Sequence, residues 1–314
     1  MDKIPVLFVI FNRPELTIET FKVIKKYQPT DLYIAADGAR KWKNGEKEKC
    51  DYTRKVILEQ IDWECNVHKL FREENVGCGL SVSGGISWMF ESEDYGIVIE
   101  DDCSPSLDFF LLCENLLPRY KDCENIMQIN GFNPVATAEA GSGYSFSRYP
   151  KIWGWATWKR AWAHFDISMK EWESYRKSNR LSKQFPFWER WIHQYVWDKY
   201  YKELQKVKSP RAWGIQWSVS IFSRDGLCIV PDTNLVVNTG EGIEATNCDV
   251  ADPLVSRCKL GKFIFPVRHP ERIELDVQIN EMDSDFYMKR KISVRIQRIK
   301  RFLKNLLKLS LIHI

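Results

Sequence analysis

The sequence predicts an α/β protein with a mostly parallel sheet flanked by helices, a tryptophan-rich second half and a C-terminal amphipathic helix. Over the first 130 residues, short apolar runs alternate with helix-like segments, which is the pattern of a parallel sheet covered by helices. Ten of the 13 tryptophans lie between Trp153 and Trp217. From Lys289 to the end, the chain has nine Lys or Arg and no Asp or Glu.

The expected strands follow one another along the first half. They are Val6–Ile10, Leu32–Ala36, His68–Phe71, Gly96–Glu100 and Ile126–Asn130. A helix is expected after the first strand, because Asn12 suits an N-cap, Pro14 the first turn and Glu15 a capping box. A second helix is expected over 82–90, after the glycine-rich segment 75–81. That segment matches neither the Walker spacing nor GxGxxG, so a loop before a helix is preferred to a phosphate cradle.

The composition changes from about Tyr149 onward, where most of the tryptophans lie. A long helix is expected over 187–204 and a late strand over 227–230. Exposed indole rings stack on the apolar faces of sugars, whereas buried ones only fill a core. Burial is the preferred interpretation for most of these tryptophans. Trp155 and Trp213 are predicted acceptor contacts, because the glycines beside them suggest close backbone approach.

The chain is divided into three parts, without a repeat or a low-complexity linker between them. Residues 1–135 are expected to bind a nucleotide-sugar donor. Residues 136–265 form a tryptophan-rich acceptor half that continues directly from the first. Residues 266–314 are a C-terminal extension that ends in the amphipathic helix.

The tail carries the positive charge of the protein. The net charge is +4, but residues 1–288 hold 37 basic and 42 acidic groups. Apolar residues recur at helical spacing between the basic ones in 289–314. Such a helix can lie on an anionic membrane, pack on the body or on a second subunit, or bind nucleic acid. Membrane contact is favoured, and nucleic acid is least expected because the rest of the chain is acidic.

Composition excludes several function classes. The nine cysteines form no CxxC or other zinc spacing and the five histidines are scattered, so no zinc site is expected. Ser83 lacks the GxSxG context of a hydrolase nucleophile. No apolar stretch approaches the roughly 20 residues that span a bilayer, and no signal peptide precedes the first strand. A reducing cytoplasm is the expected compartment.

Polar residues follow three of the expected strands. They are Asn12-Arg13, Asp37-Gly38 and Glu100-Asp101-Asp102. Ligands of open α/β sheets bind outside the carboxyl ends of the strands. Three adjacent carboxylates repel one another unless a cation or hydrogen-bond donors compensate them, and oxygen ligands suit Mg²⁺ or Mn²⁺. A solvated acidic turn is the alternative interpretation.

An ordered series of motifs resembles a known family. The motifs are Phe11-Asn12-Arg13-Pro14, Ala36-Asp37-Gly38, Glu73-Asn75 with Gly77 and Gly79, Glu100-Asp101-Asp102, Tyr149–Trp158, Trp213–Trp217 and Ile229–Pro231. Together they look like a GT-A nucleotide-sugar glycosyltransferase. They are similar to the N-acetylglucosaminyltransferase I group and to related bacterial surface-polysaccharide enzymes. The resemblance covers roughly residues 4 to 250, and the series is more specific than any single motif.

The resemblance implies roles for individual residues. The nucleotide-sugar contacts it implies, together with neighbouring candidates, are Asn12, Arg13, Asp37, Gly38, Ser81 and Asp101. Arg13 would contact ribose or phosphate oxygens, and Asp37 would accept from the base edge. An ion pair between Arg13 and Asp37 is the structural alternative. Asp102 would hold the metal, which neutralises the departing nucleotide.

The sequence departs from the family at two positions. In the inverting relatives an aspartate that acts as catalytic base follows the first Trp of the Trp-x-x-x-Trp segment, and here that position is Gly214. Glu241 and Glu244 are the nearest substitutes, although solvated loop acids are commoner. Asn247 stands where many bacterial relatives carry a metal-reaching histidine, and an amide oxygen is a weaker ligand.

The sequence therefore predicts a metal-dependent glycosyltransferase that moves a sugar, UDP-linked and with inversion, to a cell-surface glycan that is plausibly lipid-linked. Expected partners are the donor, the acceptor and an anionic membrane surface through 289–314, without nucleic acid; the oligomeric state is open. The expected location is cytoplasmic, peripheral on the inner leaflet. The alternatives are a catalytically silent sugar-nucleotide or glycan-binding protein and, last, a nucleotidyltransferase, which would need a glycine-rich loop after the first strand.

Overall fold

A computed structural model describes residues 3–207, 210–240 and 252–310. Its centre is an eight-stranded sheet with the strand order β3-β2-β1-β4-β9-β6-β10-β8. The strands are β1 (Val6–Ile10), β2 (Asp31–Ala36), β3 (Asn66–Phe71), β4 (Tyr95–Glu100), β6 (Ile126–Asn130), β8 (Tyr144–Ser147), β9 (Trp155–Trp158) and β10 (Leu227–Pro231). Six of the eight run in one direction, whereas β8 and β9 are antiparallel to their neighbours. The predicted α/β fold with a mostly parallel sheet is confirmed.

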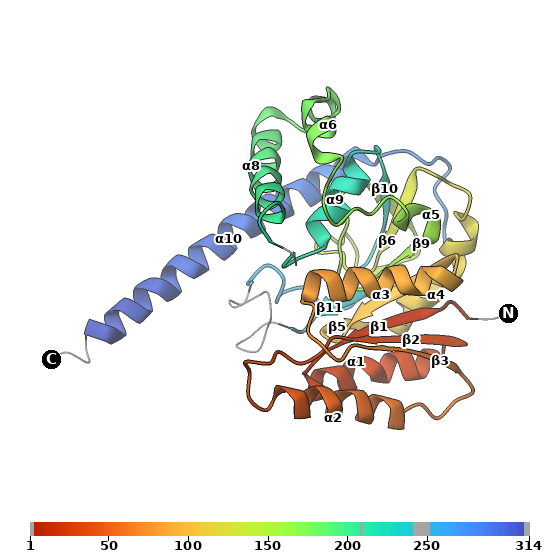
Figure 1. Ribbon diagram of the computed structural model, residues 1–314. Coiled ribbons are helices and arrows are strands. Elements are labelled where there is room, and N and C mark those ends of the chain that lie inside the picture. Colours follow the sequence, from red (N-terminus) through yellow and green to blue (C-terminus); the bar gives the residue numbers. More distant parts are fainter. Residues whose placement is uncertain (1–2, 208–209, 241–251, 311–314) are drawn as a thin grey trace.

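Helices cover both faces of the first half of this sheet (Figure 1). They are α1 (Pro14–Tyr27), α2 (Glu46–Glu59), α3 (Cys78–Ser92) and α4 (Leu107–Arg119). On one face α1 packs against α2 and α4, and on the other α3 packs against β1, β2 and β4. This is the arrangement that right-handed crossovers produce when the chain moves outward from β1 to β3 and then returns to β4.

The start of α1 differs from the prediction in one detail. Pro14 is the first residue of the helix, as expected, but the residue at the N-cap is Arg13 and no side chain caps the helix. The amide of Asn12 donates instead to Glu46, at 2.7 Å. The N-cap assigned to Asn12 is therefore wrong, because its side chain has a charge-assisted partner across the loop.

Five helices, four of them short, follow in the second half of the chain. They are α5 (Lys159–Trp162), α6 (Trp172–Lys177), α7 (Arg180–Gln184), α8 (Phe187–Leu204) and α9 (Gly214–Phe222). Two small sheets complete the fold. In one, β11 (Val236–Asn238) pairs with β5 (Cys103–Pro105), and in the other, β12 (Lys262–Phe263) pairs with β7 (Ala140–Gly141). The first of them brings the chain after β10 back to the end of β4.

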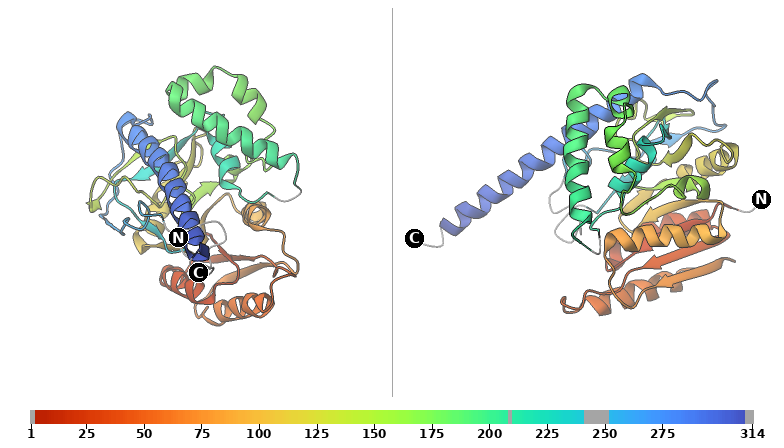
Figure 2. Two further views of the ribbon diagram at one scale, coloured as in Figure 1. Left: turned by 90° about the vertical axis from the view of Figure 1, so that its left-hand side faces the viewer. Right: turned by 45° about the horizontal axis from the view of Figure 1, so that its top comes forward.

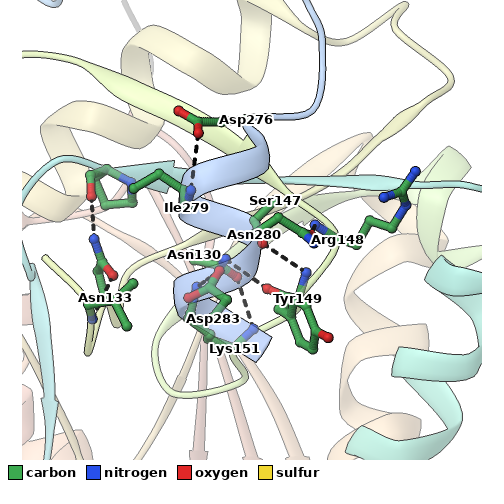
Figure 3. Close-up of polar contacts among 12 residues, drawn as sticks. Asn130, Asn133, Ser147, Arg148, Tyr149, Lys151, Asp276, Ile279, Asn280 and Asp283 are labelled. Carbon is green, nitrogen blue, oxygen red and sulfur yellow. Dashed lines mark hydrogen bonds and ion pairs between the residues drawn. The ribbon is translucent and has the colours of Figure 1, made fainter. Parts of the chain in front are cut away.

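The last helix, α10 (Val277–Ser310), is 34 residues long and begins on the body of the protein. Asp276 caps it, since its carboxylate accepts from the Ile279 amide at 3.0 Å. Asn280 accepts from the amide of Arg148 at 3.1 Å. Lys151 forms an ion pair of 2.6 Å with the buried Asp283 (Figure 3). These buried polar contacts fix one direction for the helix where it leaves the sheet.

The distal part of α10 extends away from the rest of the chain in Figure 1 and in the right-hand view of Figure 2, and it points toward the viewer in the left-hand view. Arg290 still contacts the body, because it pairs with Asp252 at 2.8 Å and its guanidinium lies over the ring of Trp153. Ile292 is already exposed. Across the part of the chain that the structure describes, no helix combines the length and the apolar composition needed to cross a membrane.

Candidate functional site

The strand order places two of the predicted polar clusters side by side. Strands β1 and β4 are neighbours, yet the chain travels from β1 outward to β3 before it returns to β4. This is the topological switch point of the sheet, and the crevice outside it is where open α/β folds bind ligands. The loops that start there are 11–13 after β1 and 100–102 at the end of β4.

Asp101 joins these two strand ends from the inside. Its buried carboxylate accepts from the backbone amide of Phe11 at 3.3 Å, from the guanidinium of Arg13 and from the hydroxyl of Thr17 at 3.5 Å. Its own carbonyl accepts from Thr20 at 3.0 Å. The donor-sugar contact predicted for Asp101 is therefore not supported, since protein groups already surround this carboxylate.

Arg13 lies between two of the three acidic residues. One of its terminal nitrogens pairs with Asp101, and the other lies 3.1 Å from Asp102. Burial alone would lower the pKa of Arg13, but the two carboxylates raise it above its ordinary value. The alternative ion pair with Asp37 does not form. The guanidinium instead supplies one positive charge to a cluster of three carboxylates.

Asp102 is the most accessible aspartate of the cluster, with 20% of its side chain exposed. Its carbonyl accepts from the amide of Thr239 at 2.8 Å, which holds the end of β11 against β4. A side chain at Gly240 would come within 2.2 Å of the Asp102 carboxylate, so only glycine allows this close approach. The thiol of Cys103 also donates to its carboxylate, at 3.6 Å.

The single positive charge of Arg13 does not neutralise the three carboxylates of the cluster. Burial, together with repulsion from the neighbouring carboxylates, raises the pKa of Glu100 to about 8. Burial also raises the pKa of Asp101, against the attraction of Arg13. Within 3–207, 210–240 and 252–310, no group of three or more His, Cys, Asp or Glu side chains is arranged to hold a metal by itself. Mg²⁺ and Mn²⁺ commonly take one or two carboxylates and complete their shell with water and substrate phosphates, which fits Asp102.

Asp37 has a different role from the one predicted. Its two carboxylate oxygens accept from the amides of Gly38, Val76 and Gly77 and from the side chain of Asn75, at 2.9 to 3.0 Å. A carboxylate has about four acceptor positions, and protein donors fill all of them. Asp37 thus holds the 75–77 turn to the end of β2, and the base-reading role predicted for it is not supported.

A second ionic cluster closes the same edge. The buried Glu46, at the start of α2, accepts from the Arg40 amide at 2.9 Å and from its guanidinium, as well as from Asn12. Burial acts to raise the pKa of Glu46, but the bonds from Arg40 outweigh it and hold that pKa at about 2. The Arg40 guanidinium also lies over the ring of Phe11. The predicted residue Asn12 therefore fixes the loop between β2 and α2.

The remaining predicted donor residues lie on the same side of the sheet. Gly38 approaches the carbonyl of Glu74 so closely that a Cβ would lie 2.3 Å from the Glu74 backbone. Ser81 is buried in the first turn of α3, where its amide donates to the Gly77 carbonyl at 2.9 Å. Both residues shape the edge through the backbone rather than by presenting a polar side chain.

The acceptor role predicted for two tryptophans is wrong. Trp155 and Trp213 are buried, and their rings stack on each other with centroids 5.5 Å apart. Trp155 lies in β9, at the middle of the sheet, where a side chain cannot reach solvent. The preferred interpretation of the group as core is confirmed for seven of the ten tryptophans: Trp155, Trp158, Trp162, Trp172, Trp197, Trp213 and Trp217 are buried.

The structure leaves the catalytic base open. Gly214 begins α9, and a Cβ there would lie 2.7 Å from the end of the Ile152 side chain. The substitutes Glu241 and Glu244, and the weak metal ligand Asn247, lie outside the described residues.

Sequence reasoning missed the residues that position the cluster. Thr17 and Thr20 lie one and two turns into α1, on the face that meets β4. Their spacing could have identified them, because small polar residues on the buried side of a helix usually have a specific partner. Glu46 carries no such signal, since its partner Arg40 lies in a loop.

Comparisons with known proteins found solved structures that are similar to this chain. No protein-family model and no curated protein sequence matches the chain. Similar structures include the mannosyltransferase PcManGT from Pyrobaculum calidifontis in complex with GDP-Man and Mn²⁺ (10% identity, 71% of this chain and 70% of that one, TM-score 0.38). Mouse xyloside xylosyltransferase 1 (10%, 70% and 81%, 0.32) and HddC from Yersinia pseudotuberculosis (9%, 50% and 77%, 0.31) are also similar. Similarities of this size do not assign a function to the chain.

Proposed function

We propose that the protein is a metal-dependent glycosyltransferase that moves a sugar from a nucleotide-diphosphate sugar, UDP-linked, to a cell-surface glycan. The observation that carries the proposal is the undercompensated carboxylate cluster at the switch point between β1 and β4, with Asp102 partly exposed to solvent. A diphosphate can approach this cluster only together with a cation. The ordered motifs that resemble GT-A glycosyltransferases support the same function.

Asp102 would hold the Mn²⁺ or Mg²⁺ ion, with Asn247 as a weak second ligand. When bound, such an ion neutralises the charge that develops on the departing nucleotide diphosphate. The chain's own contribution is to orient Asp102. Arg13 forms an ion pair with Asp102, and a second ion pair with Asp101 holds Arg13 in place. Because these partners are buried, the Asp102 carboxylate is held in place before a donor arrives.

Transfer with inversion requires a base that takes the proton of the acceptor hydroxyl. We assign this base to Glu241 or Glu244, since Gly214 has no side chain that could act. In this proposal the carboxylate belongs to the segment that follows Gly240 in the sequence. Gly240 itself packs directly on Asp102. Substituting each glutamate with glutamine separately identifies the base by loss of turnover with retained donor affinity.

One observation favours a rival function, a catalytically silent protein that binds a sugar nucleotide or glycan. The position that carries the base in the inverting relatives is Gly214, at the start of α9. The rival and the enzyme share the metal and donor site. They differ in whether the glycosidic bond to the nucleotide is broken.

A lipid-linked acceptor would bring the enzyme to the inner leaflet. The distal half of α10 supports this part of the proposal, because its residues are basic and apolar at helical spacing and it extends away from the body. Such a helix adds electrostatic attraction to an anionic surface.

The experiment combines binding and turnover. A thermal-shift panel of nucleotide sugars, with and without Mn²⁺, should show stabilisation by one donor that requires the metal, because a ligand of the folded state raises its stability. Nucleotide release from that donor, increased by an extract of lipid-linked glycans, would establish transfer. Tight metal-dependent binding without release under any acceptor condition would favour the silent protein. No stabilisation by any donor would refute both.

A further inference from the structure

The outward face of α8 exposes four aromatic side chains. They are Phe187, Trp188, Trp191 and Tyr195, which we call the α8 aromatic face. Trp191 and Tyr195 are each 63% exposed, and Phe187 is 75% exposed. The rings of Trp191 and Tyr195 are nearly parallel, at 15°, with centroids 6.0 Å apart. Large rings with this exposure are uncommon on a protein surface unless something covers them.

The opposite side of α8 explains why these rings point outward. Glu189, His193 and Trp197 are buried, and they follow one another at four-residue spacing along the side that faces the body. His193 stacks on Tyr287 of α10 with centroids 5.2 Å apart. Aromatic side chains thus lie on both sides of the helix, although only one side is packed within the chain, and this pattern predicts a second contact.

In the last turns of α8 the outward face carries three lysines beside two acidic residues. A surface hollow of about 420 Å³ continues from Tyr195 toward the helix end, and its lining consists of Tyr195, Asp198, Lys199, Lys202, Glu203 and Lys206. Lys199 lies 4.0 Å from Glu203, within reach of an ion pair. The face therefore combines aromatic rings with lysines whose long stems let the ammonium groups reach away from an apolar contact.

We propose that the α8 aromatic face inserts into the headgroup region of an anionic bilayer. The aromatic rings project along one side of a single helix as a ridge, and a bilayer interface accommodates such a ridge. Trp and Tyr favour that interface because one part of each ring is apolar and the other polar. The lysines beside Tyr195 face anionic headgroups in the same contact. This contact is separate from the one proposed for α10 and does not depend on the transferase activity.

The test measures binding of the full chain to vesicles by co-sedimentation. Vesicles contain phosphatidylglycerol and phosphatidylcholine, or phosphatidylcholine alone. The variant Trp191→Ala/Tyr195→Ala should bind the anionic vesicles about tenfold more weakly or worse, because two large apolar side chains no longer insert. The matched control Trp42→Ala/Tyr52→Ala also removes one Trp and one Tyr, which are 80% and 55% exposed in another part of the molecule. It should bind within about twofold of wild type.

A second measurement reports the contact directly. Brominated lipids should quench part of the wild-type tryptophan fluorescence, and less of it in the Trp191→Ala/Tyr195→Ala variant. Equal vesicle binding by the two double variants would overturn the proposal. So would self-association of the wild type that only the Trp191 variant loses, since the occupant would then be a second copy. Nucleotide release from a soluble donor should be the same in all three proteins, so failure of the proposed function would leave the vesicle result unaffected.

Discussion

The charge imbalance at the end of β4 predicts how stability depends on pH. In the folded protein, burial and the two neighbouring aspartates raise the pKa of Glu100 to about 8, whereas an unfolded glutamate has a pKa of about 4.3. Between pH 7 and 8 the folded state therefore binds more protons than the unfolded state. The free energy of unfolding falls as pH rises through this window.

The size of the effect follows from the two pKa values. Integrating the difference in bound protons from pH 7 to 8 gives a loss of about 1 kcal/mol. The Glu100→Gln variant keeps the shape of the side chain but cannot ionise, so it should not show this loss. Histidines titrate alike in both proteins and cancel in the difference. Urea unfolding in a chelating buffer at four pH values, for wild type and variant, measures it.

Adding Mn²⁺ should remove the difference between the two proteins. A bound cation lowers the proton affinity of the carboxylates around it, so wild-type Glu100 would already be ionised at pH 7. Parallel curves for wild type and Glu100→Gln without metal would show that the carboxylates do not repel one another as described. An unchanged slope in Mn²⁺ would place the cation elsewhere.

Three further predictions address the remaining parts of the site. Asp102→Ala should abolish metal-dependent donor binding in calorimetry while the melting temperature without metal stays within a few degrees; undiminished binding would disprove the metal assignment. Glu46→Gln should lower the free energy of unfolding by about 2 to 4 kcal/mol at pH 7, because the low pKa of this buried carboxylate means that the folded state favours its charged form by about that amount. Since the pKa of Glu46 is held at about 2, wild type should lose the same stability as the pH falls from about 4 toward 2, and a flat acid limb would contradict this. Removing residues 294–314 should weaken binding to anionic vesicles, while the contacts of Asn280, Asp283 and Arg290 with the body keep the melting temperature close to that of wild type; undiminished binding would show that the distal helix is not needed.

Much of the sheet could be predicted from the sequence, for a physical reason. Parallel strands buried on both faces are continuous apolar runs bounded by turn residues. The predicted ranges for β1 and β6 match the structure at both ends, and those for β2, β3, β4 and β10 differ by at most two residues per end. The 187–204 helix also matches.

The strand β9 shows why other parts could not be predicted. Trp155–Trp158 has no alternation of polar and apolar residues, and it pairs with β4 and β6 from distant parts of the chain. When the strand pairing is unknown, tryptophans beside glycines resemble a ligand-binding surface. Burial depends on which strands lie on either side, and local sequence does not contain this information.

The same limit applies to the site. The motif at residues 100–102 identified where a cation would bind, because three adjacent carboxylates are costly in any fold. The motif did not reveal which carboxylate oxygens are already bound by protein donors and which can bind a ligand. Asp37 accepts from amides about 40 residues away, and backbone amides leave no trace in residue type. The sequence thus identified the edge of the sheet where a ligand would bind. The structure showed that the carboxylate of Asp37 is bound by protein donors, whereas that of Asp102 is partly exposed.

The buried tryptophans at the centre of the sheet also give the protein an optical signature. Trp155, Trp162, Trp213 and Trp217 form one cluster with centroids between 5.1 and 6.2 Å apart. Indole transitions at this separation couple, so the folded protein should show paired circular-dichroism bands of opposite sign that vanish on unfolding. The cluster links β9 to α9, so the intensity of these bands reports, without any added label, whether α9 remains packed on the sheet.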